Sequence, residues 1–291
     1  VEEEVRQATK IAPAFRELQV NSGATVVPIA PDADVANWNA TGIETAANAL
    51  TDNADTNFTV SNVTLTAHRL ISGTYIANDV DEQVVITMLP IITSAVARAH
   101  ARAIDAAIML GNANFVGLTG SAGTDGASGT AMYAVDSAQT DLLLNGTAPV
   151  TSAMLLSLRA EMGKYGLSAQ DIVFILNNEE YFSMIGDDGF ADISQVGSDQ
   201  AFKILGQVGN VYGTPVIVTD TVARAANATA AVAVNTANYV IPRLKGISIE
   251  TDYEVAGQRT AVVAAQSLGF GQLVNGYTNN EPAMRLDYAA S

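Results

Sequence analysis

Hydrophobic and polar residues change their spacing several times along the chain, and each change predicts a different element. Residues 24–30 read ATVVPIA, a short strand in which Pro28 fits an edge or bulged position. Residues 58–67 alternate apolar and polar side chains, and the phase changes at Ser61 and Asn62, which predicts a β-bulge. The polar stretch between these strands has about 27 residues, and loops of that length usually have a function. We therefore predict an extended hairpin arm that overhangs its own subunit.

The strongest helical pattern covers residues 79–110. Apolar residues at spacings of three, four and seven share one face of this helix: Val84, Met88, Ile92, Val96, Ala103 and Ala107. Gly111 is expected to end the helix and Pro90 to kink it. At 1.5 Å per residue such a helix is about 45 Å long, so we predict a rigid spine.

Beyond the spine the pattern becomes a mixture of helices and strands. The glycines spaced by three within 117–129 follow a helix, which favours a mobile linker over a phosphate-binding loop. Within 130–242, a helix capped by Thr151 or Ser152 precedes the strand DIVFILN, the helix NEEYFSMIG and the strands GTPVIVTD and NYVIP. Past Leu244, two long strand-like runs have no helix between them. We therefore predict an α+β protein whose compact middle lobe is inserted into an elongated, β-rich lobe.

Composition narrows the function classes. The 291 residues are 48% hydrophobic and 15% charged, which is typical of a globular protein. The net charge of -16 repels a phosphate backbone, so a broad nucleic-acid-binding surface is not expected. The absence of cysteine excludes disulfides and thiol chemistry, and no apolar run reaches the 18 or so residues of a membrane span. The sequence starts at Val1 without a signal-peptide pattern, from which we expect that an upstream segment was removed.

Candidate catalytic groups are scattered. His68 and His100 have no carboxylate and nucleophile at triad-like spacing, and we interpret both as structural. Glu179 and Glu180, and likewise the Asp187–Asp188 pair, are adjacent residues and are interpreted as a solvated acidic face, since acid–base pairs need opposed placement across a cleft. We predict no catalytic, cofactor-binding or metal-binding residues, and no enzyme activity.

Two groups of charges have two interpretations each. Arg98, Arg102 and Asp105 fall at helical spacings and predict an ion-pair stripe on the spine, either solvated or facing a neighbour. Arg259 lies across a turn from the acidic residues that include Glu254, and this charged loop tip is either a solvated hairpin or an inter-subunit ion-pair site.

The order of these parts resembles the major capsid protein family of tailed bacteriophages, whose shell fold encapsulins share. The resemblance covers nearly the whole chain, as a diffuse pattern in a specific order. Four stretches carry it: NALTDNADTNFTVSNVTLTAHRL as the hairpin, DVDEQVVITMLPIITSAVARAHARAIDAAIMLGN entering the spine helix, MLLSLRAEMGKYGLSAQDIVFILNNEEYFSMI as the axial domain and YGTPVIVTD where that domain turns back.

The resemblance implies a domain organisation: an N-terminal arm (1–23), an extended hairpin arm (24–57), a peripheral domain (58–129 and 243–291) and an axial domain (130–242). It implies a structural protein that self-assembles into hexamers and pentamers of an icosahedral shell around double-stranded DNA, without sequence-specific binding and without a membrane. The expected location is the virion capsid, assembled in the host cytoplasm. Portal and scaffold or cement proteins are the expected partners, and the missing Met fits removal of an N-terminal scaffolding segment.

Expected assembly contacts lie on the arm, the spine and the loop tip: Trp38, Leu50, Phe58, Arg98, Arg102, Glu254 and Arg259. Some relatives join subunits covalently through a lysine in the hairpin. Here the matching position offers Thr51, and no lysine occurs between Lys10 and Lys164, so we expect a non-covalent shell.

Three alternative functions remain. An encapsulin would have the same fold but enclose cargo enzymes. A soluble α/β enzyme would need opposed carboxylates in a pocket, and a secreted surface protein is compatible with the absence of cysteine but gains no support.

Overall fold

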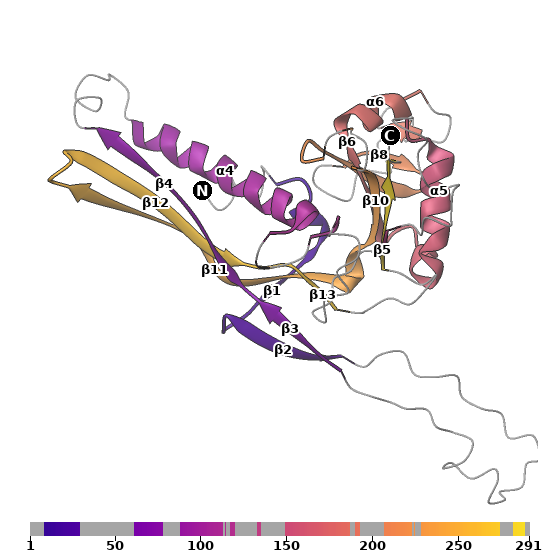
Figure 1. Cartoon of the computed structure of the whole chain (residues 1–291), viewed down its shortest axis with the longest axis horizontal. Helices are drawn as coiled ribbons and strands as arrows, with labels where there is room; N and C mark the ends of the chain where they lie inside the picture. Colours follow the sequence, from indigo (N-terminus) through magenta and orange to yellow (C-terminus); the bar gives the residue numbers. More distant parts are fainter. Residues whose placement is uncertain are drawn as a thin grey trace, which may run out of the picture.

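The protein has two lobes and a projecting hairpin (Figure 1). The structure, a computed structural model, describes residues 9–29, 61–77, 88–112, 114, 117–119, 133–134, 149–186, 190–192, 207–222, 224, 228–273 and 282–288. One lobe is long and narrow, and the other is compact. The predicted mixed α+β architecture is confirmed.

The elongated lobe is a five-stranded sheet with a helix along one face. Its strand order is β1 (Arg16–Gln19), β11 (Tyr239–Glu254), β12 (Arg259–Leu268) and β4 (His68–Ala77), with β13 (Gly271–Gln272) also paired to β11. All of these pairs are antiparallel except β1 with β11. Helix α4 (Met88–Leu110) lies along β4, and the β11–β12 ribbon extends to the far end of the lobe (Figure 1).

The compact lobe is a seven-stranded sheet with helices on one face. Its strand order is β5 (Tyr133–Ala134), β14 (Ala283–Asp287), β10 (Thr229–Asn235), β6 (Ile172–Asn177), β9 (Thr214–Thr219), β8 (Gln207–Val211) and β7 (Phe190–Asp192). The helices are α5 (Ser152–Glu161) and α6 (Asn178–Met184), and a 3-10 turn η3 (Gly163–Gly166) follows α5. The predicted cap is confirmed, because the Thr151 hydroxyl accepts from the Met154 N–H at 3.4 Å.

The two faces of this sheet contribute to two different cores. On one face, Phe174 and Leu176 pack with Leu155 and Leu158 of α5. On the other face, alternate residues such as Ile175 pack against the C-terminal half of α4 and the base of the five-stranded sheet. Three rings in this second core meet with centroids 5.2–6.0 Å apart: Phe15, Tyr239 and Phe270. The second core therefore fixes the two lobes to each other.

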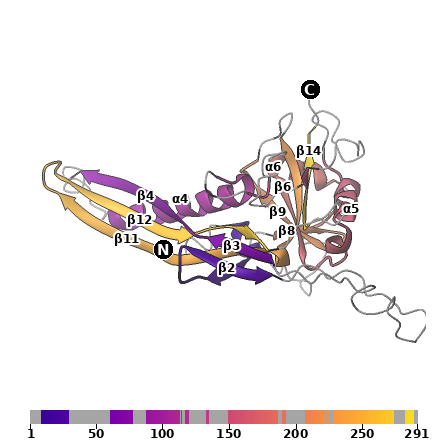
Figure 2. The same ribbon diagram turned by 60° about the horizontal axis from the view of Figure 1, so that its bottom comes forward.

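A two-stranded hairpin projects from the junction of the lobes. It pairs β2 (Ala24–Ile29) with β3 (Ser61–Thr66), and in two views its open end points away from α4 (Figures 1 and 2). The edge position predicted for Pro28 is confirmed, since a two-stranded sheet has only edge strands. The bulge predicted at Ser61 and Asn62 is wrong, because the register is regular there and the strand is interrupted at Ala67 instead.

Close packing at this interruption explains its position. The Ala67 N–H donates to the Gly23 carbonyl at 2.8 Å, and Gly269 lies against the carbonyl of Thr66. A Cβ atom at residue 269 would lie 1.9 Å from that oxygen, so glycine is needed for the crossing.

The start of the chain is not a free arm where the structure describes it. A 3-10 turn, η1 (Ala12–Ala14), lies against α4, and Ile11 and Phe15 are buried. The strand β1 then pairs in parallel with β11. Of the arm predicted over 1–23, this part is therefore integrated into the elongated lobe, because its apolar residues fill the second core.

The spine helix ends as predicted, but its buried face is shifted from the predicted one, with which it shares Val96. Gly111 follows α4 with a φ of 75°, which confirms the expected stop. The residues buried on α4 are Val96, Ala97, His100, Ala101, Ile104, Asp105, Ile108 and Met109. Ala103 and Ala107 are only half-buried. Two polar residues on the buried face explain the error in the apolar pattern. The predicted start at 79 lies outside the described residues.

Two segments join elements to which the sequence did not assign them. Gly117, Leu118 and Thr119 are not linker: the last two N–H groups donate to the carbonyls of Ile108 and Met109 at 2.7 Å, at the end of α4. The strand β14 lies within 243–291, the range predicted for the elongated lobe. It instead pairs with β10 in the compact sheet, where Met284 and Leu286 face the first core.

Candidate assembly surfaces

The open face of the five-stranded sheet carries exposed apolar side chains. Along β4, residues alternate between half-buried and exposed, because Leu70 and Ser72 face α4 and their neighbours face outward. Ile71 is 52% and Tyr75 59% exposed, and Val263 of β12 is 37% exposed on the same face. A one-sided sheet that leaves this face uncovered is suited to contact another molecule.

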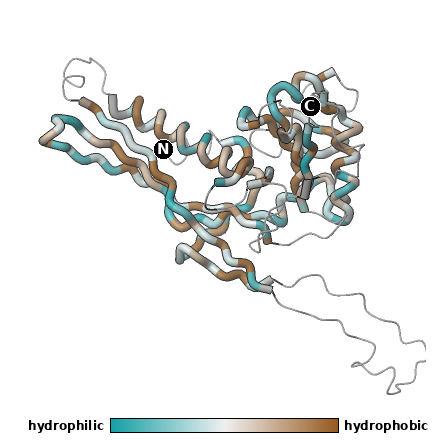
Figure 3. The backbone as a smooth tube through the Cα atoms, in the orientation of Figure 1, coloured by the Kyte–Doolittle hydropathy of each residue, from teal (hydrophilic) through white to brown (hydrophobic). Residues whose placement is uncertain are grey.

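The far end of this face carries a pre-arranged arginine. The Arg259 Nε donates to a Glu254 carboxylate oxygen at 2.5 Å, and the guanidinium carbon lies 3.9 Å from the centre of the Tyr75 ring. The Arg259 hydrogen bond lowers the pKa of Glu254, and the same bond raises the pKa of Arg259. The two charges pair within one hairpin and stay exposed. The register also places Glu250 and Asp252 on this face. Figure 3 shows this end of the ribbon as hydrophilic.

The outer side of α4 carries the predicted arginines but not the predicted aspartate. Arg98 and Arg102 are exposed, whereas Asp105 is on the buried side of the helix. The Asp105 carboxylate accepts from the backbone N–H groups of Lys10, Ile11 and Ala12 at 2.7, 3.2 and 3.1 Å. Burial raises the pKa of Asp105, against the effect of these donors. The prediction that Asp105 belongs to an ion-pair stripe is therefore wrong. Its carboxylate instead holds the backbone of residues 10–12 against α4.

Both histidines take part in packing contacts of the elongated lobe. His100 is buried between α4 and the sheet, with its Nε2 atom 2.7 Å from the Ser72 hydroxyl and its Nδ1 atom 2.9 Å from the Gln266 amide nitrogen. Burial lowers the pKa of His100. The Nε2 atom of His68 lies 3.2 Å from the Thr66 hydroxyl, between the end of β3 and the start of β4.

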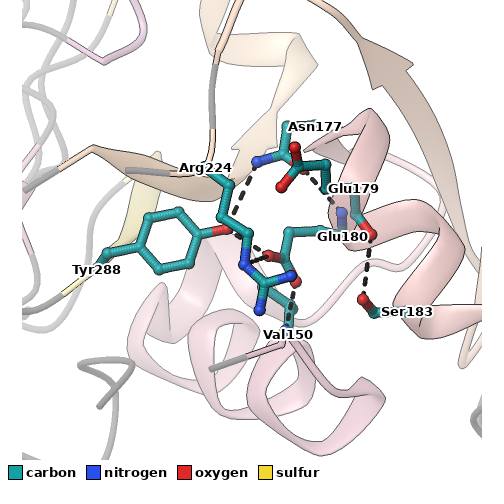
Figure 4. Close-up of polar contacts among 7 residues, drawn as sticks. All are labelled: Val150, Asn177, Glu179, Glu180, Ser183, Arg224 and Tyr288. Carbon is teal, nitrogen blue, oxygen red and sulfur yellow. Dashed lines mark hydrogen bonds and ion pairs between the residues drawn. The ribbon is translucent and has the colours of Figure 1, made fainter. Parts of the chain in front are cut away.

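Glu180 does not lie on a solvated acidic face. Its side chain is fully buried and joins four segments of the compact lobe (Figure 4). One carboxylate oxygen accepts from the Val150 N–H at 2.5 Å, and the other accepts from the Tyr288 hydroxyl and lies 3.4 Å from Arg224 Nε. Burial of the Tyr288 hydroxyl is the main cause that raises its pKa, and the hydrogen bond to the Glu180 carboxylate raises it further. Asn177 caps α6 through the Glu180 N–H at 2.8 Å. This enclosed network is a structural joint.

One sequence signal could have indicated this joint. An Asn followed three residues later by Glu is close to the capping-box pattern, which marks a helix start and a Glu that turns back toward it. Here Glu180 reaches Val150 instead of the cap residue. Its neighbour Glu179 is exposed, in agreement with the predicted acidic face.

Several predicted residues lie outside the described residues: Trp38, Leu50, Phe58, Asp187 and Asp188. Among the residues that the structure does describe, no cluster of three or more His, Cys, Asp or Glu could hold a metal ion. In the same part of the chain, no helix has the length and apolar character needed to cross a membrane.

Comparison with solved structures identifies the fold class as that of phage capsids. The capsid of an empty GTA particle superposes with a TM-score of 0.66 at 16% identity, over 97% of this chain and 90% of that one. The capsid structure of the cyanophage P-SCSP1u superposes with a TM-score of 0.60 at 15% identity, over 97% of this chain and 89% of that one. A structure from Mycobacterium phage Adephagia superposes with a TM-score of 0.61 at 14% identity, over 97% of this chain and 91% of that one. The chain therefore has the fold of tailed-phage capsid proteins, as predicted.

Sequence comparison leads to the same group of proteins. The chain is 29% identical over 255 residues to the major capsid protein of Escherichia phage T5, and the aligned region covers 87% of this chain. The chain spans about half, 53%, of the length of that curated relative. No family model matches the chain. The predicted resemblance to the major capsid proteins of tailed phages is confirmed.

Proposed function

We propose that the chain is the structural subunit of a tailed-phage capsid, and that it assembles into hexamers and pentamers of an icosahedral shell around double-stranded DNA. The observation that carries this proposal is the similarity to the phage T5 major capsid protein across 87% of the chain. The shared fold, with its two lobes and hairpin, supports it independently.

The exposed surfaces of the subunit also support a shell. Obligate assemblies commonly bury 2,000 Å² or more, and a long sheet with one open face, apolar along β4 and charged at its far end, provides such area without a larger body. The β2–β3 hairpin is only two strands wide, and a lone two-stranded hairpin is marginally stable in water. Leu65 is the one fully buried side chain among its described residues. Packing of the arm against a neighbouring subunit would provide the missing contacts.

In the assembled shell, the compact lobe takes the axial position and clusters around the five-fold and six-fold axes. The elongated lobe forms the periphery, and the arm predicted over 24–57 lies across the next subunit of the ring. The exposed group of Tyr75, Glu254 and Arg259 forms contacts at the local three-fold positions. Tyrosine and arginine are the residue types that dominate interface energies, and both are held in place here.

The charge of the chain fits a container rather than a DNA-binding protein. With a net charge of -16, the subunit encloses DNA without adhering to it through a broad basic surface. The proposed role is non-enzymatic. Portal and scaffold or cement proteins are the proposed partners, and assembly takes place in the host cytoplasm.

Negative-stain electron microscopy of particles from infected cells, combined with a nuclease-protection assay, tests the proposal. The expected result is closed icosahedral shells that contain protected double-stranded DNA. Shells that carry only protein cargo would favour an encapsulin. A protein that stays monomeric with its scaffold present would contradict the proposal. On heated SDS gels, the shells are expected to give the single-subunit band of a non-covalent assembly.

A further inference from the structure

The outer edge of β11 is only partly covered within the subunit. The strand β1 pairs with β11 as far as Arg243, and the Gln19 side-chain amide reaches one residue further, to the Leu244 carbonyl at 3.3 Å. From Lys245 to Glu254, β11 pairs with β12 on its inner side, and no strand among the described residues pairs with its outer side. Figures 1 and 2 show this end of β11 with β12 on one side and no labelled strand on the other. We call this stretch the β11 edge.

An uncovered strand edge of this length is suited to the addition of another strand. In an antiparallel sheet, alternate residues of an edge strand direct their N–H and C=O groups away from the neighbouring strand, so the β11 edge presents about five donors and five acceptors in a row. Such edges pair with extended segments of other chains unless the protein shields them. The β11 edge contains no proline that would block this pairing.

The side chains of the β11 edge determine which segment can pair with it. Glu250 and Asp252 lie on the open face of the sheet and are exposed, and neither has an ion-pair partner in the described part of the chain. Glu254, in contrast, is paired with Arg259. Two copies of β11 paired antiparallel around Thr251 would place Glu250 of one copy opposite Asp252 of the other, and like charges at opposed positions destabilise a sheet. The edge therefore disfavours pairing with a second copy of itself.

A strand with alternating basic residues has the complementary chemistry. Lysine or arginine at every second position of an added strand would lie about 5 Å from Glu250 and Asp252. The residues between them would lie on the opposite face, beside Thr251 and Tyr253. Tyr253 is 46% exposed and offers an aromatic surface to apolar side chains.

We propose that the β11 edge binds an extended segment of a second protein, in which basic and apolar residues alternate. The net charge of -16 favours a basic partner over another acidic chain. This inference rests on the proposed function, under which scaffold or cement proteins accompany the shell, and it names the surface and the chemistry by which one of them binds.

Two designed peptides test the proposal on the isolated, full-length subunit. The probe is acetyl-TKVKVKVT-amide, and the control of opposite charge is acetyl-TEVEVEVT-amide. Fluorescence anisotropy of labelled peptides at low ionic strength measures binding, because salt screens exposed charges. The basic peptide should bind, and the acidic peptide should bind about ten-fold more weakly or worse, since two attractive charge pairs become repulsive. Equal binding of the two peptides would overturn the proposal.

Amide hydrogen exchange locates the bound peptide. The N–H groups that point toward β12 are already paired, so strand addition should slow exchange only at alternate residues between Lys245 and Glu254. Slowing at β4, the other edge strand of this sheet, would overturn the proposal. Alternating protection that appears without peptide as the subunit concentration rises would also overturn it, because a second copy would then occupy the edge.

Charge reversal on the β11 edge provides an independent test. The E250K/D252K variant should prefer the acidic peptide over the basic one, an exchange of preference that a folding defect cannot produce. The D171K/E179K variant changes the net charge by the same amount at exposed positions of the compact lobe, and it should keep the preference of the unmodified chain. An unchanged preference in E250K/D252K, or the same exchange in D171K/E179K, would contradict the proposal.

These measurements use the isolated subunit, so their failure differs from failure of the proposed function. Shells that form around DNA from a subunit whose β11 edge does not bind the basic peptide would overturn only this inference. A subunit that binds the peptide but forms no shell with its scaffold present would instead overturn the proposed function, and with it the assignment of the partner to the virion.

Discussion

The two lobes bury their strands in opposite ways. In the compact lobe, every residue of β6, β9 and β10 is buried, as expected for central strands covered on both faces. In the elongated lobe, β4 has no fully buried residue and alternates between half-buried and exposed positions, and the last five residues of β11 are all exposed. One lobe completes its packing within the subunit, and the other leaves one face of its sheet and the end of its ribbon exposed.

This difference separates stability from assembly. Substitutions in the compact lobe and at the junction should unfold the subunit, because their contacts are internal. Substitutions on the exposed end of the ribbon should leave the subunit folded and act only when copies meet. The following predictions test this division, in order of decreasing expected effect on the stability of the isolated subunit.

The largest effect is expected for Glu180→Ala in the compact lobe. The substitution leaves the Val150 N–H, the Tyr288 hydroxyl and the Arg224 guanidinium without their shared acceptor. Breaking a buried charged network of this kind costs about 3–5 kcal/mol. Urea denaturation of the unassembled subunit measures this loss in the free energy of unfolding. The matched control is Glu179→Ala, one residue away and exposed, which should change the free energy of unfolding by less than about 0.5 kcal/mol. Equal effects of the two substitutions would show that the network is not structural.

A smaller effect is expected for Asp105→Ala at the junction of the lobes. The change removes the acceptor for three backbone N–H groups but leaves η1 its apolar contacts through Ile11 and Phe15. We expect a loss of about 2–3 kcal/mol in the free energy of unfolding. Hydrogen exchange at Lys10, Ile11 and Ala12 should accelerate more than at α5, which lies in the other lobe. Uniform acceleration across the chain would argue against a local role in fastening the N-terminal segment.

A modest pH dependence is expected from His100 in the elongated lobe. Burial lowers its pKa in the folded state below the ordinary value of 6.5, so the unfolded chain binds the proton more readily. The contribution of His100 to stability is therefore complete above pH 6.5 and decreases as the pH falls below that value. Its contacts, Ser72 and Gln266, are neutral and do not titrate with it. Thermal melting between pH 5 and 7 should show a shallower slope for His100→Gln than for the unmodified chain, and equal slopes would contradict this role of His100.

The smallest effect on the isolated subunit is expected for Arg259→Glu at the end of the ribbon. The side chain pairs with Glu254 at the surface, so its reversal should leave the melting temperature unchanged within error. Shell formation should nevertheless be impaired, because the variant places like charges together at a proposed contact. Particle yield by sedimentation measures this effect. Normal shells from the variant would remove Arg259 from the set of assembly contacts.

Local sequence patterns predicted the elements that depend on neighbouring residues. Residues close in sequence determine three of these features: the end of the spine at Gly111, the Thr151 cap and the strand at 172–177. The order of these elements was specific enough to predict the fold. The exposed positions of Arg98 and Arg102 also follow from helical spacing alone.

The errors arose where a polar residue is buried by a distant partner. Asp105 pairs with backbone groups 93–95 residues away, and Glu180 pairs with a tyrosine 108 residues away. A pattern of apolar spacing treats both as surface residues, because nothing nearby indicates the acceptor role that their burial requires. The position of β14 was missed for the same reason, since β-pairing over a long distance has no local signal.

The pairing of β1 with β11 sets a time limit on how this chain folds during synthesis. Arg16 lies opposite Val240, so 224 residues must be added after the first strand before its partner exists. At about 5–20 residues per second, the ribosome needs roughly 10–45 s for that distance. The compact lobe waits as well, because β10 needs β14 as its neighbour, and β14 begins only at Ala283. Neither sheet can be completed until these distant strands have been made, so β1 and the open edge of β10 must stay unpaired on the ribosome for that time.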